Sequence, residues 1–217
     1  MISKLLNITV IAEILSFLSA ALLLNSKTKS WQLFTLFLFI TIVVESIGWY
    51  MHWHLGVKQN DCVFNILMIG TTPFLLYIFS KSERLEHCKR EMLNLAFAFV
   101  LIAVFNMCLF QGFWNYNKYS DIAGSFIAVY ISTKYLLIIV KDDKSENLLF
   151  DEYFWLSNGL VFYSLGGIII YVFFESLRQF HKATSINVFG YINTVLNILL
   201  YLSLTIAFIC RRINTKQ

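Results

Sequence analysis

Long apolar segments dominate this chain and limit what it can fold into. Seven can be marked, separated by short polar connections: roughly Leu5–Leu24, Trp31–His54, Cys62–Ser80, Met92–Gln111, Asp121–Val140, Phe150–Phe174 and Asn187–Cys210. A helix of about 20 apolar residues crosses the hydrocarbon layer of a bilayer. Backbone polar groups in that layer must be satisfied within the segment, which favours helices. The sequence therefore predicts a single all-α domain over residues 1–217, a membrane bundle of about seven transmembrane helices embedded in a lipid bilayer.

Composition agrees with a membrane protein. Of the 217 residues, 58% are hydrophobic and only 14% are charged, whereas soluble domains carry about 25% charged residues. The first apolar segment contains Glu13 and is followed at once by Lys27 and Lys29. These features favour a retained first helix over a cleaved signal peptide.

The distribution of basic residues predicts the orientation, because cytoplasmic loops carry an excess of Lys and Arg. The side that follows the odd-numbered helices holds eleven such residues and the other side holds five. The eleven are Lys27, Lys29, Lys81, Arg84, Lys89, Arg90, Lys141, Lys144, Arg211, Arg212 and Lys216. We therefore expect an external N-terminus and a cytoplasmic C-terminus, in the plasma (bacterial inner) membrane.

Two carboxylates lie inside apolar segments, Glu13 in the first and Glu45 in the second. A charged side chain at the centre of a membrane helix costs about 2.5–3.5 kcal/mol on insertion scales, so such residues face the bundle and usually mark function. Counted from the ends of their segments, both fall in the outer half of the membrane. We predict that Glu13 and Glu45 form one ligand- or ion-binding site.

Helical spacing adds polar residues to this predicted site. His52 shares a helix face with Glu45, and Asn193 and Asn197 start a polar stripe of residues four apart on the seventh helix. Residues that would extend the same outer vestibule are Asn65, Asp121 and Ser125. The alternative is that the Asn, Ser and Thr residues only bind helices together, through hydrogen bonds of about 0.6 kcal/mol each. The His-x-His pattern at the end of the second segment places its two rings on different helix faces, so no metal site is predicted.

A second candidate set consists of basic residues on the predicted cytoplasmic side. Its members are Lys81, Arg84, Lys89, Arg90, Arg211 and Arg212. They are first a topology signal, but they would also attract anionic lipid headgroups or a soluble anion such as a nucleotide. Nearby acidic residues (Glu83, Glu86 and Glu91) weaken this positive field.

Common catalytic and cofactor motifs are missing from the sequence. It contains no HExxH, no Gly-x-Ser-x-Gly, no phosphate-binding glycine loop and no CxxC. We therefore expect no cofactor and no enzyme activity, with an intramembrane enzyme as a third alternative. Microbial rhodopsins also have seven helices and an external N-terminus, but their retinal needs a lysine on the seventh helix. The segment Asn187–Cys210 contains none, so no retinal is expected.

The connections, none longer than about a dozen residues, leave no room for a soluble domain. Activity is therefore expected within the bilayer or through a partner. We favour an ion or small-solute channel or transporter, acting as a homo-oligomer, with gating by an anionic cytoplasmic signal as a variant. The alternative is a seven-helix sensor that relays an external or membrane ligand to a cytoplasmic signalling partner. A pore would conduct as the purified protein alone, whereas a sensor would require its partner.

Overall fold

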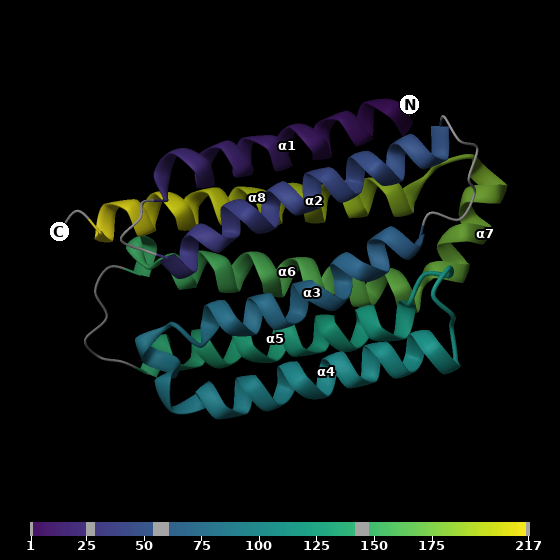
Figure 1. Cartoon of the computed structure of the whole chain (residues 1–217). Coiled ribbons are helices and arrows are strands. Elements are labelled where there is room, and N and C mark those ends of the chain that lie inside the picture. The colour runs from purple at the N-terminus through teal and green to yellow at the C-terminus, as the bar shows by residue number, and fades with distance from the viewer. Residues whose placement is uncertain (1, 25–28, 54–60, 142–147, 216–217) are drawn as a thin grey trace.

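The computed structural model describes residues 2–24, 29–53, 61–141 and 148–215 (Figure 1). Within these ranges the chain forms helices and turns, with no strand. The helices are α1 (Ile2–Leu23), α2 (Lys29–Trp53), α3 (Asp61–Phe79), α4 (Lys89–Leu109), α5 (Lys118–Lys141), α6 (Glu152–Val172), α7 (Phe174–Thr184) and α8 (Val188–Asn214). Two short 3-10 helices, η1 (Glu83–Cys88) and η2 (Leu148–Phe150), precede α4 and α6.

Six helices in the described part of the chain are long and apolar enough to cross a membrane: α2, α3, α4, α5, α6 and α8. The first predicted segment corresponds to α1, in which Ile8–Leu23 forms a shorter apolar helix. An all-helical fold with several long apolar helices is thus confirmed.

The long helices run side by side and alternate in direction (Figure 1). As a result, α1 begins at one end of the bundle and α8 finishes at the other; we call these the N-terminal end and the C-terminal end. Packing is most extensive between α8 and its neighbours α6 and α1, and between α5 and α6. Helix α4 lies on the side of the bundle opposite α1 (Figure 1).

Large apolar side chains cover the outside of the bundle. Leu22 of α1 is 79% exposed, Leu93 of α4 is 70% exposed and Val140 of α5 is 76% exposed. Soluble monomers rarely expose apolar patches larger than a few hundred Å². The outer surface is therefore of the kind that contacts lipid.

An aromatic core fills the C-terminal half of the bundle. Trp31, fully buried, packs edge-on against Tyr153 with ring centroids 5.2 Å apart, and Phe34 packs against Phe208 at 5.5 Å. Such pairs contribute about 0.5–1.5 kcal/mol each beyond the burial of their surface. This half of the bundle is therefore tightly closed.

Helix α7 was not expected from the sequence, because residues 175–186 were predicted as a polar connection. Phe174, Leu177 and Phe180 recur at a spacing of three, while Glu175 and Arg178 form an ion pair between them. The segment is therefore an amphipathic helix, too short and too polar to span a membrane. It lies at the N-terminal end, turned away from the long axis of the bundle (Figure 1).

Glycine allows a close contact at the centre of α6. A Cβ atom built on Gly159 would lie 2.6 Å from the Cβ atom of Ser203 in α8, which is closer than carbon atoms can approach. A Cβ atom built on Gly167, about two turns further along α6, would meet no atom within 4 Å. The two helices therefore touch at Gly159, and they are also close at Gly166, where an added Cβ atom would lie 2.5 Å from the Leu196 side chain of α8.

Substitution of Gly159 with alanine is expected to destabilise the protein by about 1–3 kcal/mol, as overpacking does, because the Ser203 Cβ atom cannot rotate away. Gly167→Ala is the matched control, since it adds the same methyl group to the same helix without a clash. Thermal unfolding of the purified protein in detergent measures both effects. Equal melting temperatures for the two variants would contradict the close contact between α6 and α8.

Candidate functional site

The two carboxylates that the sequence places inside apolar segments come together between α1 and α2. Glu13 is 1% exposed and Glu45 is half-buried. The two carboxyl groups lie close enough to interact electrostatically, and Tyr201 of α8 lies near Glu13. The Oε1 atom of Glu13 is buried and has no hydrogen-bond partner among the described residues. The site therefore has an acceptor that a proton, a donor or a cation could use.

No basic side chain offsets this pair of carboxylates within the described ranges. Neither Glu13 nor Glu45 forms an ion pair with a described Lys, Arg or His. Burying an ionised carboxylate without a partner is strongly unfavourable. A bound proton or a small cation would remove this cost.

The pair lies near the middle of the bundle. Glu13 is eleven residues after the start of α1, and Glu45 is eight residues before the end of α2. At 1.5 Å per residue these positions are about 16 Å and about 12 Å from the N-terminal end. The pair therefore lies well inside the bundle, away from both of its ends.

A pocket opens nearer the N-terminal end, between α5, α6 and α8. Its empty volume, which includes space open to solvent, is about 400 Å³. The lining residues are Asp121, Ser125, Tyr163, Gly167, Ile170, Tyr171, Phe189, Asn193 and Leu196. Tyr163 lies within electrostatic range of both Asp121 and Glu45, and Tyr201 lies within range of Tyr163 and both glutamates. Tyr163 therefore lines the pocket and lies in the same region of the bundle as Glu45.

Two tyrosines surround the Asp121 carboxyl group. The Tyr116 hydroxyl donates to Oδ2 of Asp121 at 2.5 Å and also hydrogen-bonds the Tyr171 hydroxyl. The rings of Tyr116 and Tyr171 stack with centroids 5.9 Å apart. Burial and the Asp121 charge raise the pKa of Tyr116 far above its ordinary value. Tyr116 therefore stays a neutral hydrogen-bond donor to the carboxylate.

The remaining residues of the predicted site lie in different surroundings. Asn193 lines the pocket, whereas the Nδ2 atom of Asn197 donates to the Asn193 carbonyl in the same helix at 2.8 Å. The side chain of His52 lies outside the described side chains. Of the predicted vestibule residues, Asp121 and Ser125 line the pocket.

Asn65 has a structural role instead. Its Nδ2 atom donates to the carbonyls of Phe113 (2.9 Å) and Asn115 (2.8 Å), and its Oδ1 atom accepts from the backbone of Asn117. These bonds fix the connection between α4 and α5. Because its amide is fully occupied by backbone groups, Asn65 does not extend the pocket.

Sequence reasoning missed the part that Tyr163 and Tyr171 take in this region. Tyrosine usually marks the interfaces of a membrane protein, so a tyrosine on its own points to no site. Tyr163, however, lies well inside α6, and this mid-helix position is the signal that could have identified it. Tyr171 lies at the end of α6 and carries no such signal.

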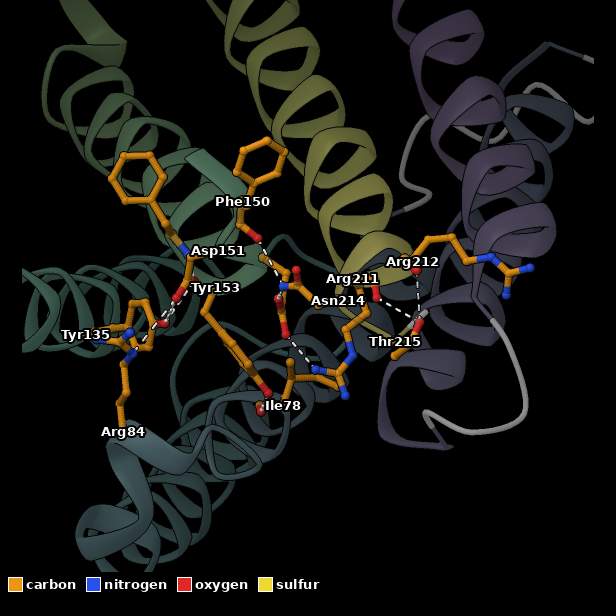
Figure 2. A network of polar contacts seen from close by, with 12 residues as sticks. Ile78, Arg84, Tyr135, Phe150, Asp151, Tyr153, Arg211, Arg212, Asn214 and Thr215 are labelled. Atoms are coloured by element: carbon orange, nitrogen blue, oxygen red, sulfur yellow. Dashed lines mark hydrogen bonds and ion pairs between the residues drawn. The ribbon is translucent and has the colours of Figure 1, made fainter. Parts of the chain in front are cut away.

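At the C-terminal end, a polar network joins the start of α6 to the end of α8 (Figure 2). Arg211 donates to Oε1 of Glu152 at 2.5 Å, and Asn214 donates to Oε2 of Glu152 at 2.7 Å. Next to this cluster, the Tyr135 hydroxyl donates to Asp151, whose Oδ1 also caps α6 by accepting from the backbone N–H of Phe154. The network therefore fixes both helix ends.

The predicted anion-facing residues are partly occupied by this network and its neighbours. Arg211 is paired with Glu152, Arg84 lies 3.9 Å from Asp151 and Lys89 lies 2.8 Å from Glu86. The Lys81 ammonium lies 4.9 Å from the centre of the Tyr77 ring. Charges that are already paired attract an external anion less, and an anionic ligand for this set stays a prediction.

Comparison with known proteins assigns no family to this chain. It matches no protein-family model, and no curated protein or solved structure shows significant similarity to it. Function must therefore be argued from the geometry of the carboxylate pair and the pocket.

Proposed function

We propose that this protein transports a small cation across the membrane, with Glu13 and Glu45 as the central cation-binding site. The observation that carries the proposal is the position of Glu13, which is 1% exposed, lies beside a second carboxylate and has an unpartnered Oε1 atom. Carboxylates inside membrane bundles are rare and mark ion or proton pathways. A cation that crosses the site would supply the missing positive charge.

The surroundings of the pair support a carrier more than an open channel. On the side of the N-terminal end, the pocket and Tyr163 lead towards the glutamates. On the other side, the aromatic core around Trp31 and Phe34 and the network of Glu152 and Arg211 close the bundle. In alternating access, a gate of this kind must open before the cation can leave.

The proposal also covers the number of spanning helices and the orientation of the protein in the membrane. We propose that α1 spans the membrane as the seventh helix, because it carries Glu13 and packs against α2 and α8. The N-terminal end would face outward and the C-terminal end the cytoplasm of the cell, with the protein in the plasma membrane. Homo-oligomerisation and gating by a cytoplasmic anion stay predictions.

Flux into liposomes tests the proposal. Liposomes that contain the purified protein should lose a preset gradient of Na⁺, K⁺ or H⁺ faster than protein-free liposomes do. Monitoring each ion separately identifies the transported species. Ion release no faster than in protein-free liposomes, for all three ions and for gradients in both directions, would contradict transport and favour the sensor alternative.

A further inference from the structure

We propose that the pocket between α5, α6 and α8 binds a small organic ammonium ion, with Asp121 as its counter-ion. The inference adds an organic-cation site on the pocket side of the proposed cation pathway, and in that respect it rests on the proposed function. Binding to the pocket can nevertheless be measured without any transport.

The first ground is the uncompensated charge of Asp121. Its side chain lines the pocket and accepts from the neutral Tyr116 hydroxyl, and no described Lys, Arg or His forms an ion pair with it. Lys118, one turn earlier, places its ammonium group 6.0 Å from the Phe174 ring of α7. Asp121 also lies in the first turn of α5, where the helix dipole stabilises a negative charge. The pocket therefore presents a carboxylate that lacks a cation.

The second ground is the aromatic lining. Tyr163, Tyr171 and Phe189 line the same pocket as Asp121. Aromatic rings attract ammonium groups by about 0.5–2 kcal/mol, and such rings are the common recognition elements for quaternary ammonium ligands. A carboxylate together with aromatic rings suits an organic cation and disfavours an anion.

The donor set and the size narrow the ligand further. Metal ions such as Ca²⁺ need about 6–8 oxygen ligands, but no group of three His, Cys, Asp or Glu occurs among the described residues. Only about 50 Å³ of the pocket is open to the centre of a water-sized sphere, so the pocket suits a compact ligand. Ser125 and Asn193 add hydrogen-bonding groups beside the carboxylate. A compact ammonium ion fits these properties better than a metal ion or a large ligand.

Calorimetric titration of the full chain with choline tests the inference. The protein is held in nanodiscs of phosphatidylglycerol, so that no lipid carries an ammonium group. Choline should bind, and 3,3-dimethyl-1-butanol, its neutral analogue of the same shape, should bind at least about tenfold more weakly, a difference of about 1.4 kcal/mol. Absence of choline binding, or equal binding of the neutral analogue, would overturn the inference.

Variants locate the binding in the pocket. Asp121→Asn keeps the shape and an acceptor for Tyr116 but removes the charge, and it should weaken choline binding by about tenfold or more. Phe189→Leu removes an aromatic ring and should weaken binding by a smaller factor, which keeps the test open if the first variant does not fold. Glu175→Gln on α7 is the control at the same end of the bundle and should bind choline like the wild type. Unchanged choline affinity in Asp121→Asn and Phe189→Leu would overturn the inference.

Two further measurements distinguish free choline from a lipid headgroup as the ligand, and failure of the transport proposal from failure of the pocket proposal. We expect the free ion to be the ligand, so choline affinity should be the same in phosphatidylcholine nanodiscs; a lower affinity there would identify the lipid headgroup as the occupant of the same site. Choline binding that depends on Asp121, without any cation flux, would contradict the proposed transport alone. Flux of inorganic cations that depends on Glu45, without ammonium binding, would overturn this inference alone.

Discussion

Replacement of Glu45 with glutamine is expected to lower cation flux by about tenfold or more, equivalent to about 1.4 kcal/mol of lost interaction, while the protein stays folded. Glutamine keeps the size and most of the hydrogen-bonding capacity of glutamate but removes its charge. Glu45 lies beside the buried Glu13 and has no ion-pair partner among the described basic residues. A role limited to packing would tolerate the substitution, since a neutral amide enters the membrane more easily than a carboxylate.

Three further variants test whether the loss of flux is specific to the two glutamates. Glu13→Gln should also reduce flux, and the double variant should be no slower than the slower single variant, because residues that act as one unit are not additive. Glu86→Gln, on an exposed side chain at the C-terminal end, serves as the control and should transport like the wild type. Stable and fully active Glu13→Gln, Glu45→Gln and double variants would reduce both residues to a packing role.

Substitution of Glu152 with alanine is expected to destabilise the protein by about 3 kcal/mol, the lower limit for a broken buried ion pair. Glu152 is 7% exposed and accepts from both Arg211 and Asn214. Its removal leaves the Arg211 guanidinium without a counter-charge, and the Nε atom of that group is already buried without a partner. Thermal unfolding in detergent measures the loss.

Two controls separate this effect from a general loss of charge. Glu86→Ala removes the exposed partner of Lys89 and should leave the melting temperature near that of the wild type, because exposed ion pairs contribute little. The double variant Glu152→Gln with Arg211→Met removes the unpaired charge and should recover part of the stability. Equal melting temperatures for Glu152→Ala and Glu86→Ala would show that the Glu152–Arg211 pair does not fix α6 and α8.

The helical membrane fold could be predicted because it depends on local properties of the sequence. Apolar runs of about 20 residues indicate spanning helices whatever their neighbours are. Helix α7 could not be found in this way, since its apolar residues Phe174, Leu177 and Phe180 are separated by charged and polar ones. Its length of 11 residues also falls below what a search for membrane spans detects.

The candidate site could be predicted only in part, because some of its features are local properties of the sequence and others depend on how the helices pack. Glu13 and Glu45 are conspicuous because a carboxylate in an apolar run is costly, and short connections place consecutive helices side by side. The partners of Glu152 could not be identified, because Arg211 is 59 residues away in sequence and its pairing depends on how α6 and α8 pack. The place of Tyr163 beside the pocket could not be predicted either, since only the packed bundle shows which helix face it occupies.

Cation binding by the two glutamates can be observed directly by infrared difference spectroscopy of the reconstituted protein. Exchange of the bathing cation, or a step in pH, should change the carboxyl bands of the wild-type protein, because Glu13 and Glu45 take up or release the ion. The double variant Glu13→Gln with Glu45→Gln should lack this change, and Glu86→Gln should retain it. A difference spectrum in the double variant that matches the wild type would contradict a cation site at Glu13 and Glu45.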